Sequence, residues 1–187
     1  MSTAKRQASL LRGINVGGHN RVAMAVLRGL YEGLGCSDVE TYVQSGNVVF
    51  SSSLGPERIG PMVEAAIRRE LGLEIRVLGR THEALGRVVA TNAFAGADPA
   101  WRHVVFLSHP LPAEAADMLR DAASGREKVV VAGREIHLQL PDGVGRSKLS
   151  QALIERRLKV TATARNWRTV TRLHDLTGVD ARATIGP

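Results

Sequence analysis

The chain has 187 residues, 44% of them hydrophobic and only 4% aromatic, which predicts one large or two small domains with mainly aliphatic cores. Its formal net charge is +7, and its single cysteine, Cys36, excludes an intrachain disulfide and a four-cysteine zinc site. The N-terminal sequence lacks the apolar run of a secretory signal, and no segment approaches the roughly 18 apolar residues of a membrane helix. We therefore expect a cytoplasmic protein with no membrane partner.

Apolar periodicity in the first half predicts the order βαββαβ. The expected strands are 7–11, 39–44, 48–52 and 74–78, and the expected helices are 23–34 and 56–70. Ser45-Gly46-Asn47 predicts the turn of a compact hairpin between the second and third strands. A further short helix is expected at 81–89, with Thr81 as its N-cap.

Residues 91–100 lose periodicity and gather Gly, Pro and Asp, which indicates a linker. The same order then repeats, with strands expected at 103–107, 128–131, 135–140 and 160–163, and helices at 112–122, 147–158 and 166–176. The order βαββαβ is that of the ferredoxin-like motif.

We therefore predict an α+β protein with two ferredoxin-like units in tandem, each an antiparallel sheet with helices on one face, and an extra C-terminal helix. The expected boundaries are 1–91 for the first unit and its short helix, 92–101 for the linker, and 102–187 for the second unit and the C-terminal helix. The two units are also compatible with packing as one domain.

The positive charge is concentrated in two stretches. Residues 1–31 carry five basic residues and no acid, and residues 146–172 carry eight basic residues and one acid. Subtracting +5 and +7 from the total of +7 leaves the rest of the chain at −5. Concentrated positive charge attracts phosphates, although Arg156, Arg157 and Lys159 are also typical of a helix C-terminus, the interpretation favoured for these three.

Two segments, SLLRGINVGGHNRVAMAVLRGLYEGLG and VETYVQSGNVVFSS, closely resemble the opening of the family called domain of unknown function 1697. HVVFL, GRSKL and TARNWRTVTRL are similar to its later parts, so the resemblance spans essentially the whole chain. Family members often have Asn-Pro-Phe near mid-chain, where this chain has Asn92-Ala93-Phe94. The resemblance implies a bacterial-type soluble protein with a duplicated α+β fold and no established activity.

Candidate ligand-binding residues in the first half lie in two polar loops. The Gly-rich segment after the first strand contains Arg12, Asn15, Gly17 and Gly18, in a setting where backbone N–H groups can bind an anion. The alternative is a tight connection whose glycines only supply positive φ. In a ferredoxin-like unit this loop and the hairpin Gln44, Ser45, Gly46 and Asn47 share one end of the sheet, where they are expected to form a concave pocket.

Candidate residues in the second half are Arg146, Ser147 and Lys148 at the start of the expected helix 147–158, with Ser147 as N-cap, together with Arg165 and Asn166 after the last strand. Cations oppose the dipole at a helix N-terminus, which a bound anion would explain. The equivalent position in the first half is Gly79-Arg80-Thr81.

No catalytic constellation, metal-ligand spacing or cofactor motif is recognisable. Trp167 has helical spacing with Val170 and Leu173, which favours a core position over base stacking. The leading hypothesis is a protein that binds an anionic or phosphate-bearing ligand, a nucleotide or nucleic acid, through its basic loops. An enzyme acting on a phosphorylated metabolite and a structural module without a small ligand remain as alternatives, and the oligomeric state is left open.

Overall fold

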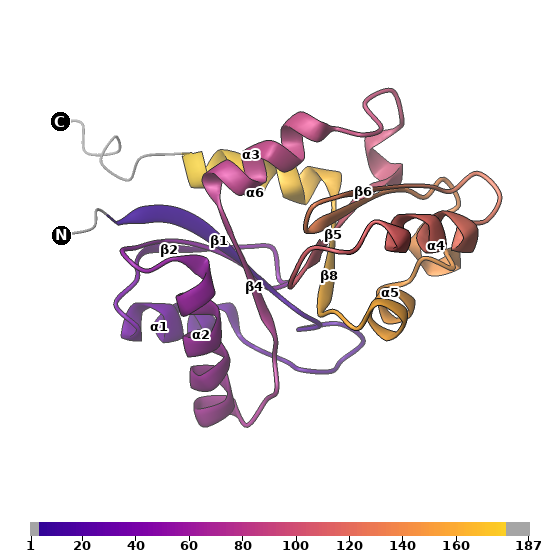
Figure 1. The fold of residues 1–187 in the computed structure, drawn as a ribbon. Helices are drawn as coiled ribbons and strands as arrows, with labels where there is room; N and C mark the ends of the chain where they lie inside the picture. Colours follow the sequence, from indigo (N-terminus) through magenta and orange to yellow (C-terminus); the bar gives the residue numbers. More distant parts are fainter. Residues whose placement is uncertain (1–3, 179–187) are drawn as a thin grey trace. The chain divides into compact units, whose positions relative to one another are not determined.

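The computed structural model describes residues 4–178. Within them the chain forms two four-stranded antiparallel sheets and six α-helices, a mixed α+β architecture (Figure 1). Of the described residues, 4–87 together with 172–178 form one compact unit, and 88–171 form the other. The division therefore falls inside two helices, after residue 87 and after residue 171.

The first unit is built around β1 (Lys5–Leu11). The strand order is β2-β3-β1-β4, so β1 pairs antiparallel with β3 on one side and with β4 on the other. The other elements are α1 (Met24–Gly33), β2 (Ser37–Tyr42), β3 (Asn47–Ser52), α2 (Pro56–Leu71), β4 (Val77–Thr81) and α3 (His82–Thr91).

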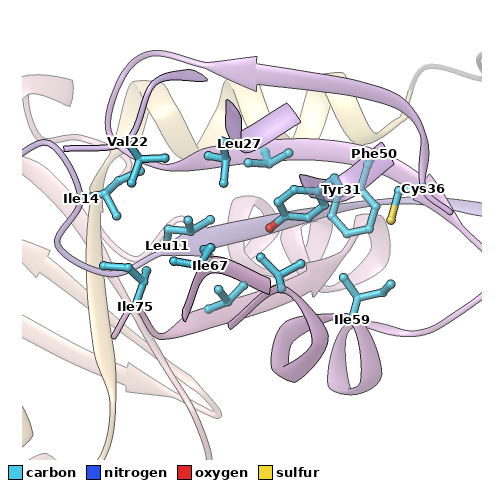
Figure 2. Packing of buried hydrophobic residues seen from close by; sticks show 13 residues of the cluster. Leu11, Ile14, Val22, Leu27, Tyr31, Cys36, Phe50, Ile59, Ile67 and Ile75 are labelled. Atoms are coloured by element: carbon cyan, nitrogen blue, oxygen red, sulfur yellow. The ribbon is translucent and has the colours of Figure 1, made fainter. Parts of the chain in front are cut away.

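The core of the first unit lies between the sheet and helices α1 and α2. Leu27 and Tyr31 of α1 and Ile59, Val63 and Ile67 of α2 are buried against Leu11, Val48 and Phe50 of the sheet (Figure 2). The rings of Tyr31 and Phe50 have centroids 4.9 Å apart with a 50° tilt, a favoured aromatic geometry. The predicted helical spacing thus places its apolar residues on the face that meets the sheet.

The second unit repeats this arrangement with the strand order β6-β7-β5-β8. Its core contains Leu119 of α4 and Ile154 of α5 packed with Val105, Ile136 and Leu138 of the sheet. The elements are a 3₁₀ turn (Pro99–Trp101), β5 (Arg102–Leu107), α4 (Glu114–Ala122), β6 (Lys128–Ala132), β7 (Glu135–Gln139), a second 3₁₀ turn (Val144–Arg146), α5 (Gln151–Leu158), β8 (Ala162–Asn166) and α6 (Trp167–Gly178).

The predicted order of strands and helices is confirmed in both halves, but several bounds differ. The strand expected at 74–78 is β4, which starts only at Val77, because Gly72 ends α2 in the left-handed conformation and the chain must return to the sheet. Ile75 packs in the core on this return without strand pairing. The strand expected at 160–163 is β8, which pairs with β5 from Ala162 to Asn166.

The last residues of α6 belong with the first unit, whereas the sequence assigned the whole C-terminal helix to the second half. Arg6 Nε donates to the Leu176 carbonyl oxygen at 2.9 Å, and the rings of His82 and His174 stack with centroids 4.6 Å apart. Thr177 Oγ1 lies 3.1 Å from His82 Nδ1. These contacts join two ends of the chain that share no local sequence pattern.

Gly46 offers a test of the hairpin packing. Its φ is +76°, and a Cβ there would lie 2.8 Å from Leu11 Cβ and 2.9 Å from Ile14 Cγ1. Gly46→Ala should therefore lower the free energy of unfolding by about 2–4 kcal/mol through strain and overpacking. Gly29→Ala is the matched control, since Gly29 is helical with nothing within 4 Å of a Cβ, and it should stabilise by about 0.5–1 kcal/mol. Equal stabilities in urea denaturation would contradict this packing.

Candidate functional site

The Gly-rich loop after β1 is held by its own side chains. Asn15 has a φ of 54°, and its Nδ2 donates to the carbonyl oxygens of Val22 at 3.0 Å and Gln44 at 2.9 Å. Its Oδ1 accepts from the Val22 N–H at 2.9 Å. Because these bonds use both amide hydrogens and the oxygen, Asn15 acts as a clamp in the folded loop. Gly17 and Gly18 also have positive φ and are exposed.

The expected neighbourhood of this loop and the hairpin is confirmed. Asn15 reaches Gln44, and the Leu11 N–H donates to the Gly46 carbonyl oxygen at 2.7 Å. Asn47 is fully buried, and its Nδ2 donates to the Tyr42 carbonyl oxygen and to Ser45 Oγ, each at 3.0 Å. Gln44 is exposed, and the Arg12 N–H donates to the Arg76 carbonyl oxygen. The polar groups Asn15 and Asn47 thus hold the turns together, while a concave pocket at this end stays a prediction.

In the second unit the helix expected from Ser147 begins four residues later. Ser150 is the N-cap of α5, with its hydroxyl accepting from the Leu153 N–H at 3.2 Å. Ser147 Oγ instead accepts from the Leu149 N–H at 3.0 Å in the preceding turn. Arg146 and Lys148 therefore lie outside the first turn of α5, which removes the predicted conflict with the helix dipole.

Arg165 and Asn166 take structural positions at the end of β8. Arg165 is only 8% exposed, and its Nη1 donates to Thr163 Oγ1 at 2.7 Å and to the Ala164 carbonyl oxygen at 2.8 Å. Burial lowers the pKa of Arg165 to about 10, so the guanidinium still carries its charge near neutral pH. Asn166 Oδ1 accepts from the Thr169 N–H at 2.8 Å and caps α6. Because Arg165 is buried whereas Arg146 and Lys148 are exposed, a large external anion has better access to Arg146 and Lys148 than to Arg165.

A hollow of about 470 Å³ lies between α4 and α5, and it contains one predicted site residue, Lys148. Arg157, which the sequence favoured as a helix C-terminal residue, also lines it. Within residues 4–178, neither cation makes an ion pair. The remaining wall is formed by Met118, Asp121, Ala122 and Leu153.

Sequence reasoning missed the part of this wall that α4 contributes. Met118 and Asp121 are separated by three positions on an amphipathic helix, so they share one face, but nothing local shows that this face meets α5. Only the strand order of the second sheet brings the two helices together (Figure 1).

Residues 4–178 contain neither a cluster of metal-ligating side chains nor a helix of membrane-spanning character. Between residues 4 and 178, no three His, Cys, Asp or Glu side chains are grouped so as to hold a metal ion. In the same range, none of the helices has the length and apolar character needed to cross a bilayer.

Burial lowers the pKa of His103 and of His137, which favours their neutral forms. Burial also raises the pKa of the Cys36 thiol, opposed by a hydrogen bond with Ser52, so Cys36 is a poor nucleophile.

The sequence and the fold have known relatives. Residues 4–137 match the family described as protein of unknown function (DUF1697), and the chain belongs to this family. Its fold is similar to the structure of the conserved bacterial protein SP0830 from Streptococcus pneumoniae, with a TM-score of 0.72 and 23% identity over 93% of this chain and 99% of that one. No curated protein matches the chain.

The core position predicted for Trp167 is confirmed, because this side chain is 9% exposed and the Arg102 guanidinium lies 4.4 Å from its ring centroid. Trp167→Ala should therefore lower the free energy of unfolding by about 3–5 kcal/mol. Arg168→Ala, at the exposed neighbouring position, should change it by less than about 0.5 kcal/mol. Denaturant titration measures both, and a Trp167→Ala protein of unchanged stability would be inconsistent with a core role.

The clamp role of Asn15 predicts a loss of stability without a loss of ligand affinity. Asn15→Ala removes three hydrogen bonds and should cost about 2–3 kcal/mol of unfolding free energy. Asn20→Ala is the matched control, because Asn20 also has a positive φ of 48° but donates one side-chain bond, to the Gly13 carbonyl oxygen at 3.1 Å. A similar loss from both substitutions in thermal denaturation would reject the clamp.

Proposed function

We propose that the protein binds an anionic, phosphate-bearing ligand in the hollow between α4 and α5, with Lys148 and Arg157 as the phosphate contacts. The observation that carries the proposal is the presence of these two cations, without ion pairs in residues 4–178, on the wall of one cavity. A cation without a carboxylate partner keeps its donors available for phosphate oxygens, and hydrogen bonds to charged groups are the strong ones.

A nucleotide is the ligand chemistry that this hollow suits best. Its volume of about 470 Å³ is within the usual range for small-molecule sites. Met118 and Leu153 offer an apolar surface for a base, and the two cations are suited to the phosphates. Asp121 disfavours a phosphate at its own position and offers an acceptor to a base or sugar instead.

The surrounding charge extends this preference to nucleic acid. Arg146, Arg156 and Lys159 are exposed in the turns and helix next to the hollow, where they can neutralise further phosphates of a strand. A single-stranded oligonucleotide is thus the larger form of the same ligand, with phosphate contacts supplying most of its affinity.

We infer that each unit is a ferredoxin-like fold, from the order βαββαβ and the antiparallel strand orders β2-β3-β1-β4 and β6-β7-β5-β8. Residues 92–101 then act as the connection between two related units. A single, buried cysteine is also in keeping with a reducing bacterial cytoplasm.

Substitutions at neighbouring arginines test the proposed site. Arg157→Ala and Lys148→Ala should each weaken nucleotide binding about tenfold, because each removes a charge-assisted hydrogen bond. Arg156→Ala is the control, since it removes the same charge from the next residue, which does not line the hollow. Isothermal titration with a nucleoside triphosphate measures all three. Equal losses from Arg156→Ala and Arg157→Ala would indicate nonspecific attraction, and no binding by the native chain would reject the proposal.

Salt dependence distinguishes a strand from a single nucleotide. Five phosphate contacts on single-stranded nucleic acid, from Lys148, Arg157 and the three neighbouring cations, predict a slope of log affinity against log salt of about −3.5, and Arg157→Ala should reduce its magnitude by about 0.7. Fluorescence anisotropy with a labelled oligonucleotide at several salt concentrations gives this slope. A flat dependence together with tight nucleotide binding would remove nucleic acid as the ligand.

A further inference from the structure

The hollow between α4 and α5 contains one acidic side chain that has no ion-pair partner. Asp121 of α4 is exposed and lines the hollow together with Lys148 and Arg157. Within residues 4–178, its carboxylate forms no ion pair, not even with the two cations on the same wall. Both carboxylate oxygens are therefore available to accept hydrogen bonds from a ligand.

The position of Asp121 is unfavourable for the helix that carries it. Because α4 ends at Ala122, Asp121 lies in the last turn, where the negative end of the helix dipole repels a carboxylate. Asp117, one turn earlier, is paired with Arg120 instead. An unpaired carboxylate at this end is destabilising, and hydrogen-bond donors of a bound ligand would offset that cost.

Each helix presents one apolar and one charged side chain to the hollow. Met118 and Asp121 are three positions apart on α4, so they share one face of that helix. Leu153 and Arg157 are four positions apart on α5 and share a face in the same way. Neighbours at these spacings have Cβ atoms about 5–6 Å apart, a distance comparable with the size of a purine ring. A base that packs on Met118 can thus place its edge at Asp121.

The pattern of donors and acceptors decides which base suits a carboxylate. An ionised carboxylate only accepts hydrogen bonds, and its two oxygens fit two adjacent N–H donors. Guanine presents two such donors, N1–H and N2–H, on the edge that pairs with cytosine. Adenine and cytosine have a ring-nitrogen acceptor beside the amino group, and uracil has one N–H between two carbonyl oxygens. Each of these three bases therefore brings an acceptor against a carboxylate oxygen, which is unfavourable.

We propose that the hollow selects guanine nucleotides, with Asp121 accepting hydrogen bonds from N1–H and N2–H of the base and Met118 packing against its ring. This proposal rests on the proposed function, because Lys148 and Arg157 hold the phosphates in both. It adds a residue that determines specificity by contact with the base. In a bound oligonucleotide, the same contact places a guanine at the hollow.

Isothermal titration of the full chain with GTP, ITP and ATP tests the proposal, in a buffer with EDTA so that no Mg²⁺ joins Asp121 to the phosphates. GTP should bind about tenfold more tightly than ATP, and ITP, whose base lacks the N2 amino group, should lie between them. Asp121→Asn should weaken GTP binding about tenfold, although it removes a negative charge near the phosphates, and it should leave ATP binding equal or tighter. Asp117→Asn is the matched control, because it removes the same charge outside the hollow and should keep the preference for GTP.

The outcomes separate this proposal from the phosphate site. If no nucleotide binds the native chain, the phosphate site and the guanine preference are both rejected. If GTP and ATP bind equally, or if Asp121→Asn changes both affinities to the same extent, the phosphate site stands and the guanine preference is overturned. The series of GTP, ITP and ATP on the native chain keeps the test decisive if Asp121→Asn fails to fold.

Discussion

The pairing of β1 between β3 and β4 determines where every polar loop of the first unit lies. Its register joins Leu10 to Asn47 and Leu11 to Val77, so the Gly-rich loop meets the β2–β3 hairpin at one end of the sheet. The same pairing joins Gln7 to Phe50 and to Thr81, so the start of β1, the end of β3 and the end of β4 meet at the other end. At the first of these ends, hydrogen bonds from Asn15 and Asn47 hold the loops together. At the other end a hollow is lined by Gln7, whose Oε1 has no hydrogen-bond partner among residues 4–178.

Polar residues at turns satisfy backbone groups before they become available to ligands. Asn15 and Asn47 donate to carbonyl oxygens within the loops, because a tight turn leaves such groups without partners in the sheet. Lys148 and Arg157 are different, because their long cationic side chains are exposed and are not needed to satisfy backbone groups of a turn. For this reason we place the candidate phosphate site in the hollow between α4 and α5 and not in the glycine-rich loops.

The sequence was sufficient for the order of elements because apolar periodicity reports which face of a helix or strand is buried. It misplaced the start of α5, since Ser147 and Ser150 are both plausible caps and only the folded turn decides between them. It also gave Arg165 a ligand role, because a basic residue next to a turn looks exposed until the register of β8 places it on a buried face. The two hollows depend on residues far apart in the chain, such as Gln7 with Glu83, which local patterns cannot join.

The two units share one arrangement of a buried arginine and a helix cap at the end of their last strands, β4 and β8. They differ in the residue that pairs with the cap. Arg80 and Arg165 are both buried, and each donates to the carbonyl oxygen of the preceding residue, at 2.9 and 2.8 Å. The residues that follow, Thr81 and Asn166, each accept from the N–H three positions on and so cap the next helix. Opposite these caps, however, the first unit has Gln7 and the second has His103, whose lowered pKa favours a neutral ring. Because the neighbour of the cap is not repeated, the hollow beside Gln7 need not have a counterpart at His103, and two units with the same order of elements can differ in their surfaces.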